Sequence, residues 1–368
     1  MNCFVKTWRH SANISAVARL SYLSVDGIVW PGMSLELETD PNVKDIPASY
    51  QIAFKSSSFN YQSILLEDVE EVIRFCGHAL TSLKLCFKSG AGFTPEIIES
   101  IKKIKGLKML FIASDPYGLQ KNHPKLIEDL LNVTNELQSL SLDIGSIRPL
   151  RLNREALPSL QHLAAACDTN DLNAITDFCE NHGHNIKCLE YLAHPGCDRA
   201  SEVILALRDL LEILFVQSVP NLLPAEISRL SFPKLKVIRS ISSPVENPSL
   251  AWLQLDILAN VQVYITDYWC SHKYWRKGLK GLKMESLIKP VDFEHIVFIT
   301  GHEPGVEEKR VLAEVFRRHH IHCHFKSCLD YIELMVSPPL ANFEMSLQSE
   351  LVEKQWPFFW PISKRGSK

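Results

Sequence analysis

The segment Asn135-Glu136-Leu137-Gln138-Ser139-Leu140-Ser141-Leu142-Asp143 carries leucines at 137, 140 and 142, in the spacing L-x-x-L-x-L. Closely related segments with mostly aliphatic residues at this spacing are Leu80-Leu83-Leu85, Leu107-Leu110-Ile112, Leu160-Leu163-Ala165, Ile186-Leu189-Tyr191, Leu211-Leu214-Val216, Leu235-Ile238-Ser240, Leu258-Val261-Val263 and Phe293-Ile296-Phe298. Successive copies begin 27, 30, 23, 26, 25, 24, 23 and 35 residues apart. Recurrence at this period is typical of a repeat solenoid, not of a globule with one centre.

Between the copies, apolar side chains recur at helical spacing behind residues that commonly begin helices. Thr94 and Pro95 are typical of an N-cap and a first helical position, and Pro124, Asp171 and Ser201 begin further segments of this kind. Strand, helix and strand connected in one sense give parallel strands with every helix on the same side. The predicted fold class is therefore α/β, a solenoid (horseshoe) with parallel strands on the concave face and helices on the convex face.

Alternation along each strand assigns the side chains to faces, because neighbouring residues point to opposite sides of a sheet. The skeleton leucines face the helices, so the residues between them face the other side, which we call the open face. The predicted partner-binding residues of the open face are Lys84, Met109, Phe111, Ser141, Asp143, His162, Glu190, Phe215, Arg239, Gln262 and Tyr264. Large apolar groups there would form a recognition surface if uncovered; the alternative is that loops or the C-terminal tail cover them.

With these features, residues 80–300 resemble a leucine-rich-repeat array of the long-repeat, ribonuclease-inhibitor-like kind. That family continues with Asn or Cys three positions after the last skeleton leucine, a feature that this sequence lacks. Irregular arrays of this sort are similar to the substrate-binding half of fungal F-box/leucine-rich-repeat proteins. The segment Cys3-Phe4-Val5-Lys6-Thr7-Trp8-Arg9 resembles the last helix of an F-box, although no match to the preceding docking helices is found. The resemblance implies a protein partner on the concave sheet face and a ubiquitin-ligase linker subunit at the N-terminus.

Four regions follow from the rhythm of the repeats. Residues 1–19 are expected to form an N-terminal cap or remnant F-box helix, and residues 20–79 irregular, strand-rich repeats. Residues 80–330 form the expected leucine-rich-repeat array, and residues 331–368 a C-terminal cap with an aromatic tail. The two prolines between Trp356 and Pro361 exclude a further helix, and four large aromatic side chains there favour capping of the last repeat over docking on a partner.

The composition gives little information about the class of partner. The net charge of -3 provides no general attraction for nucleic acid or an anionic membrane. No run of eighteen apolar residues or signal peptide is evident, and the ten cysteines are scattered without a C-x-x-C pair. We therefore expect a soluble cytoplasmic or nuclear protein with reduced thiols.

Catalytic and metal-binding motifs find little support. Gly90-Ala91-Gly92-Phe93-Thr94-Pro95 lies in the setting of a dinucleotide fingerprint, but Pro95 replaces the third glycine, which favours a plain repeat turn. Read as a strand, the segment Arg317–Lys326 places His320, His322 and His324 on one face, and two imidazoles at this spacing can share a zinc ion. The alternative is the polar face of a terminal strand, and we expect no metal, no cofactor and no catalytic residue.

Residues 264–283 interleave aromatic with basic side chains. This composition is typical of surfaces that stack on bases and contact phosphate, and equally of a long loop whose rings are buried while its charges reach water. The interpretation favoured is a non-catalytic protein–protein interaction scaffold, extended by the resemblance to substrate recognition in an F-box type ubiquitin ligase. An α/β enzyme, or a nucleic-acid-binding protein using residues 264–283, is the alternative.

Overall fold

The computed structural model describes residues 32–39, 50–54, 82–88, 93–114, 123–143, 149–167, 172–193, 200–219, 223, 225–242, 249–280, 282, 287–300 and 304–326. The chain divides into two compact units, an N-terminal unit (Met1–Phe215) and a C-terminal unit (Val216–Lys368). The predicted N-terminal cap or F-box helix (1–19) and the aromatic tail (331–368) lie outside the described residues.

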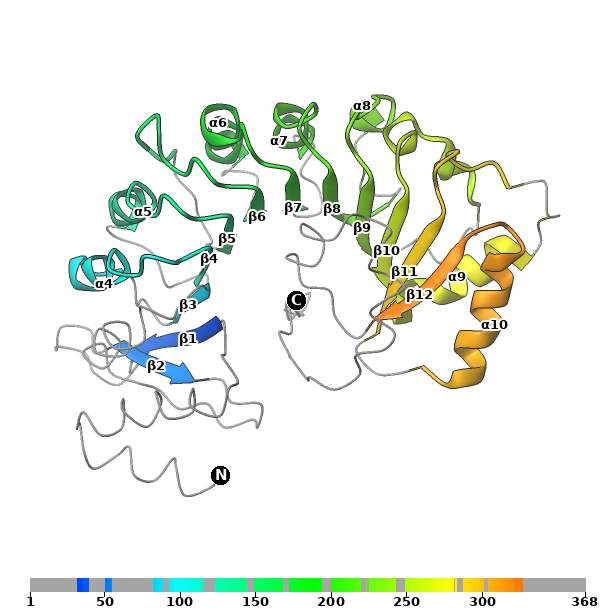
Figure 1. Cartoon of the computed structure of the whole chain (residues 1–368), viewed down its shortest axis with the longest axis horizontal. Helices are drawn as coiled ribbons and strands as arrows, with labels where there is room; N and C mark the ends of the chain where they lie inside the picture. The colour runs from blue at the N-terminus through cyan, green and yellow to red at the C-terminus, as the bar shows by residue number, and fades with distance from the viewer. Residues whose placement is uncertain are drawn as a thin grey trace, which may run out of the picture. The chain divides into compact units, whose positions relative to one another are not determined.

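In the N-terminal unit, one sheet carries the repeats (Figure 1). Its strands are β1 (Gly32–Thr39), β2 (Tyr50–Phe54), β3 (Ser82–Lys88), β4 (Met109–Ser114), β5 (Ser139–Asp143), β6 (His162–Cys167) and β7 (Cys188–Ala193), in the order β2-β1-β3-β4-β5-β6-β7. The strands from β1 through β3 to β7 are parallel, whereas β2 pairs antiparallel with β1. Helices α4 (Pro95–Ile101), α5 (His123–Leu131), α6 (Leu172–His182) and α7 (Ala200–Ala206) lie on one side of this sheet.

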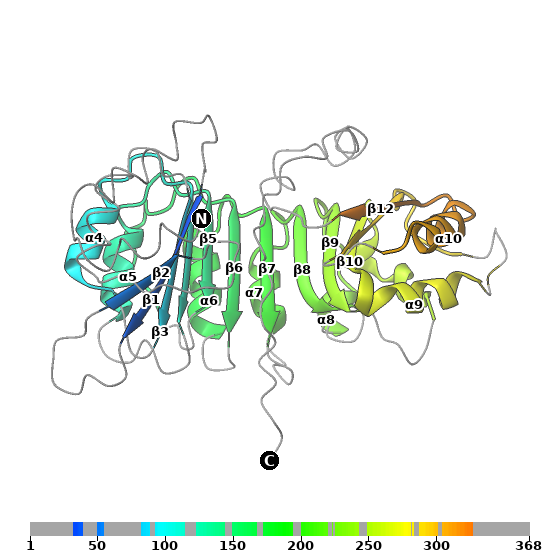
Figure 2. The ribbon, with the colours of Figure 1, turned by 90° about the horizontal axis from the view of Figure 1, so that it is seen from below.

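In the C-terminal unit, β9 (Val237–Ser242), β10 (Val263–Asp267), β11 (His295–Ile299) and β12 (His322–Lys326) are parallel neighbours in chain order (Figure 1; β9, β10 and β12 are also labelled in Figure 2). Strand β8 (Ile213–Ser218) contains the boundary between the two units. The helical elements are α8 (Ala225–Ser228), the 3-10 helices η2 (Ala251–Gln254) and η3 (Asp256–Leu258), α9 (Tyr268–Lys280) and α10 (Val306–Arg317). The described elements thus show an α/β solenoid in which parallel strands alternate with helices, and this confirms the predicted fold class.

The predicted skeleton forms continuous buried rows across the N-terminal sheet. The first row pairs Leu83, Leu110, Leu140, Leu163 and Leu189 in register, and none of these is more than 1% exposed. The second row pairs Leu85, Ile112, Leu142, Ala165 and Tyr191, none more than 3% exposed. Burial of each large aliphatic side chain contributes roughly 2 kcal/mol, so these rows hold each strand beneath its helix.

Backbone hydrogen bonds also connect successive repeats just before each strand begins; we call this series the carbonyl ladder. The amides of Gln138 and Ser139 both donate to the carbonyl of Lys108, over 2.8 and 2.9 Å. The amides of Gln161 and His162 repeat this on the carbonyl of Gln138, over 2.9 and 3.0 Å. These backbone hydrogen bonds therefore fix the register of each of these strands against the preceding strand, independently of the side chains.

The helix that follows β3 begins as the sequence predicts. Thr94 is the N-cap of α4, and its hydroxyl oxygen accepts a hydrogen bond from the amide of Ile97 over 3.3 Å, with Pro95 at the first position. The segment Thr94–Pro95 is therefore the start of a repeat helix, whereas Gly90, Ala91 and Gly92 of the predicted turn lie outside the described residues.

Two predictions about the C-terminal unit are wrong. Residues 264–283 do not form a long loop, because residues 263–267 are a strand and residues 268–280 are helix α9. The repeat at this strand is Val261-Tyr264-Thr266, since Tyr264 pairs with the buried Ile238 and Ile296. Tyr264 therefore faces the helices, not the open face.

Gly183, which follows α6, lies where successive repeats pack closely against each other. A Cβ added at Gly183 would overlap the carbonyl of Cys179 and lie 2.7 Å from the Leu207 side chain. We expect Gly183→Ala to lower the free energy of unfolding by about 2 kcal/mol through overpacking, as measured by urea denaturation. Gly305→Ala is the control, because its nearest neighbour would be 4.0 Å away; a loss there equal to that at Gly183 would contradict the packing argument.

Candidate partner-binding surface

The open face of the N-terminal unit brings most of the predicted residues into two rows. Lys84, Phe111, Ser141, Ala164 and Glu190 occupy successive positions of one row. Ser82, Met109, Ser139, His162 and Cys188 occupy the other. Asp143 lies further along β5 and pairs with Ala113. The register thus aligns these positions from β3 to β7 as strand alternation predicts.

Exposure divides the large apolar side chains of this face into two groups. Met109 and Phe111 are half-buried and keep part of their surface accessible. Phe215 and Ile213 are only 6% and 5% exposed. The prediction that Phe215 belongs to an uncovered surface at β8 is therefore wrong. The accessible apolar part of the predicted surface is therefore at β4.

A buried polar line crosses β5, β6 and β7. The Ser139 hydroxyl lies 2.8 Å from Nδ1 of His162, and Nε2 of His162 lies 3.6 Å from a carboxylate oxygen of Glu190. Ser139 and His162 are 4% and 2% exposed. Ser139 lies two residues before the predicted Ser141 on β5 and was not among the predicted partner-binding residues. The line fixes the imidazole between two neighbouring strands and leaves the Glu190 carboxylate at the surface.

In the C-terminal unit, one row of the open face carries Arg239, Ile265, Val297 and His324 in register. Arg239 is half-buried, whereas Ile265 and Val297 are fully buried. Gln262 precedes β10, where its carbonyl accepts the amides of Glu294 and His295 over 3.1 Å each. Gln262 is therefore part of the carbonyl ladder at the strand entrance.

Tyr264, also predicted for the open face, lies in the core. Its side chain is 1% exposed, and its ring packs against Trp252 and Trp275 with centroids 5.4 and 5.5 Å apart. Its hydroxyl lies 2.5 Å from the Ser240 hydroxyl. A tyrosine can occupy a skeleton position here because Ser240, at the adjacent skeleton position, provides the hydrogen-bond partner that its hydroxyl needs.

Three histidines gather on the open face of β11 and β12. His295 Nδ1 lies 3.0 Å from His324 Nε2, and the His295 ring centroid lies 5.3 Å from those of both His322 and His324. His320 is not part of this cluster, because it lies in an exposed turn with φ of 56° before the strand begins. Sequence reasoning missed His295, although it lies two residues after Phe293, beside a recognised repeat.

Within the described part of the chain, no group of three or more His, Cys, Asp or Glu side chains has an arrangement that could hold a metal ion. In the histidine cluster, burial and then the neighbouring His295, His322 and Lys326 lower the pKa of His324 to about 4. A carboxylate oxygen of Glu294 lies 3.9 Å from Nε2 of His295. Burial and these neighbouring groups thus favour the neutral form of the His324 imidazole in the folded protein.

On the helix side, α9 separates its aromatic from its basic residues. Tyr268, Tyr274 and Trp275 are at most 2% exposed, and Trp252 donates from Nε1 to the Tyr274 hydroxyl over 2.9 Å. Trp269 is the exception, with 53% exposure. Since buried rings cannot stack on bases, the main reason for predicting a nucleic-acid surface at residues 264–283 is removed.

Comparisons with known proteins add little to this geometry. No family model and no curated protein matches the chain. Among solved structures, the chain is similar to the leucine-rich repeat-containing protein LegL7 from Legionella pneumophila, with a TM-score of 0.42 and 13% sequence identity, covering 78% of this chain and 98% of LegL7. Separately, none of the described helices has the length and apolarity needed to cross a membrane.

The buried Ser139–His162 contact predicts a measurable contribution to stability. Ser139→Ala removes the hydroxyl 2.8 Å from His162 Nδ1 in a buried site, so we expect the free energy of unfolding to fall by about 1 kcal/mol. Ser228→Ala removes an exposed hydroxyl that donates to the carbonyl of Ala225, and is expected to change it by less than about 0.5 kcal/mol. Equal losses from both substitutions in chemical denaturation would contradict a special role for the buried contact.

The histidine cluster predicts a loss of stability in acid. With its pKa lowered to about 4 in the folded state, His324 takes up a proton more readily when unfolded, so stability present above about pH 6.5 is lost as the pH falls toward 4. His324→Asn removes this titrating group, so the loss of unfolding free energy between pH 7 and pH 4.5, measured by denaturation, is expected to be smaller. The expected difference is only about 1 kcal/mol, because solvent screens the partly exposed ring. His320→Asn, outside the cluster, is expected to keep the wild-type difference; an unchanged loss in His324→Asn would contradict the account.

Proposed function

We propose that this protein is a non-catalytic scaffold that binds a protein partner on the open face of its parallel sheet. The observation that carries the proposal is the distribution of the helices. Each described α-helix lies on the side of the buried leucine rows, and none of the described helices covers the opposite side. A sheet covered on one side presents its other side chains to a macromolecule.

The N-terminal unit provides the chemistry that such recognition needs. Met109 and Phe111 offer partly accessible apolar groups on β4, while Asp143 and Glu190 offer partly accessible carboxylates on β5 and β7. Large apolar side chains near the centre of an interface commonly carry most of the binding energy, and charges around them select the partner. The arrangement favours a partner segment with an apolar anchor and basic side chains.

A narrower version of the proposal makes the chain the substrate-recognition part of an F-box type ubiquitin ligase. It is supported only by the resemblance of Cys3–Arg9 to the end of an F-box. Co-purification of the intact chain with the ubiquitin-ligase linker subunit tests this version. Failure to recover the linker subunit would remove the ligase role and leave the scaffold role unaffected.

The alternative of an α/β enzyme has weaker support. Such enzymes commonly cover both faces of a parallel sheet with helices and bind ligands at the ends of the strands. The Ser139–His162–Glu190 line carries the residue types of a hydrolytic triad, but Ser139 and His162 are buried. A buried hydroxyl has no access for a substrate, which favours a structural role for the line.

A charge placed at Phe111 tests the scaffold directly. We expect Phe111→Glu to reduce protein capture by the immobilised intact chain at least about tenfold, because it introduces a carboxylate into the apolar part of the open face. Captured proteins are identified and quantified by mass spectrometry. Val133→Glu is the matched control, since Val133 is 39% exposed after helix α5, on the helix side. Capture that survives Phe111→Glu, or is lost equally in Val133→Glu, would contradict binding at the open face.

A further inference from the structure

The exposed side chains of helix α9 are four cations together with Trp269 and Cys270. Its exposed cations are Lys273, Arg276, Lys277 and Lys280, and the helix contains no acidic residue. In the part of the chain that the structure describes, none of these four cations has an ion-pair partner. Trp269, 53% exposed, begins the same face.

The spacing of these residues places them in one stripe. Trp269, Lys273, Arg276 and Lys280 follow one another at intervals of four, three and four residues, which is the repeat of a helix face. At a rise of about 1.5 Å per residue the stripe is about 16 Å long. This length matches a few turns of a bound helix or a short extended peptide.

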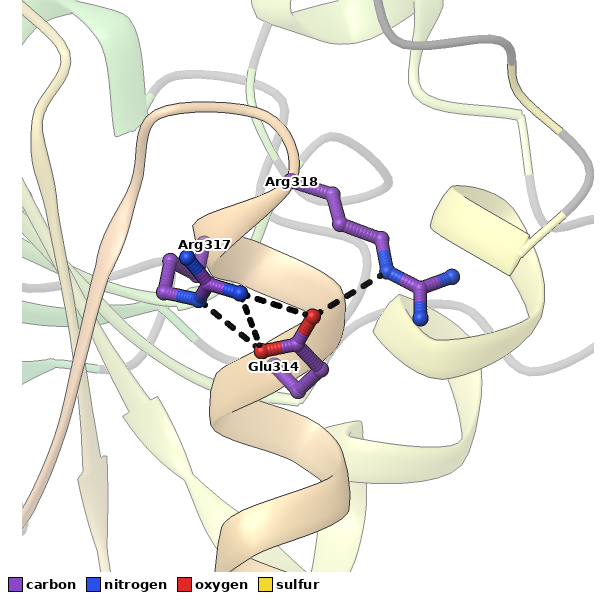
Figure 3. Close-up of polar contacts among 3 residues, drawn as sticks. All are labelled: Glu314, Arg317 and Arg318. Atoms are coloured by element: carbon purple, nitrogen blue, oxygen red, sulfur yellow. Dashed lines mark hydrogen bonds and ion pairs between the residues drawn. The ribbon is translucent and has the colours of Figure 1, made fainter.

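The neighbouring helix shows that such a stripe is not the rule in this unit. In α10, Arg310 contacts Glu307 over 2.6 Å. Glu314 accepts from both Arg317 and Arg318, over distances of 2.8 and 3.4 Å (Figure 3). The arginines of α10 are thus neutralised within their own helix, whereas the cations of α9 are left without carboxylates.

The buried side of α9 holds the stripe in place. Tyr274, Trp275 and Leu279 are at most 2% exposed, and the Tyr274 hydroxyl donates to the carbonyl of Ser249. Trp275 packs against Phe316 of α10 with ring centroids 5.5 Å apart. Because these contacts fix the helix before any partner arrives, binding at the stripe requires little ordering of the backbone.

We propose that this stripe of α9 is a second docking surface, which binds an acidic segment of a partner protein carrying an apolar residue for Trp269. Four unpaired cations complement carboxylates at helical spacing, and an exposed tryptophan is the side chain most often found as an anchor in protein interfaces. Single-stranded nucleic acid fits less well, because Trp269 is the only large aromatic side chain of α9 that is exposed and the chain as a whole carries a net charge of -3. This surface lies on the helix side and is independent of the proposed open-face function.

Fluorescence anisotropy of a labelled glutamate-rich peptide with leucines at helical spacing, titrated with the intact chain, tests the proposal. We expect saturable binding that weakens with salt. Lys273→Gln together with Lys277→Gln is expected to weaken it about fivefold, as the loss of two exposed charge pairs. Trp269→Ala is expected to weaken it further, while circular dichroism shows the helix content unchanged.

Lys234→Gln together with Lys236→Gln is the matched control, since it removes two exposed lysines of the same unit that do not belong to α9. Binding that falls equally in this control, or no binding of the peptide by the intact chain, would overturn the assignment. Labelled oligothymidylate or phosphatidylserine vesicles are compared at the same salt concentration. Tighter binding of either one than of the peptide would overturn a protein partner. Phe111→Glu leaves peptide binding unchanged if the two surfaces are independent, so the two proposals fail separately.

Discussion

Burial of aliphatic side chains between strand and helix is the interaction on which each unit depends. No single repeat has enough apolar surface to fold alone, but rows such as Leu83, Leu110 and Leu140 form continuous ridges when the strands stack. Those ridges must be covered, and right-handed crossovers bring every covering helix to the same side. The opposite face is therefore free of helices as a consequence of the packing.

On the open face, side chains of neighbouring parallel strands pack closely against one another, so polar groups there can be buried. Ser139 and His162 are buried on it and meet each other across the strands. His295 and His324, both half-buried, also meet across neighbouring strands in the C-terminal unit. Polar groups removed from water are stabilised when they find partners, so cross-strand contacts carry much of the order on this face. Phe111, Asp143 and Glu190 are only half-buried on this face.

In the C-terminal unit, aromatic rings take over part of the role of leucine. Trp252, Tyr264 and Trp275 contact one another with ring centroids 5.4 to 5.6 Å apart. Burying one side of α9 in this cluster forces its lysines and arginine to the other side, since charged heads remain in water. The segregation that makes α9 basic outside follows from the core and not from a separate binding motif.

The sequence alone determined the period, the class of fold and the faces of β3 to β7, because a two-residue alternation anchored on leucine has only one register that buries the leucines. It also determined the start of α4 through Thr94 and Pro95, whose preferences are local. Only the tertiary structure decided the side on which Tyr264 lies, since a tyrosine can enter a buried row when another strand supplies Ser240 as its partner. The meeting of His295 with His324, and of Ser139 with His162, likewise depended on the register between strands that are separated by a whole repeat.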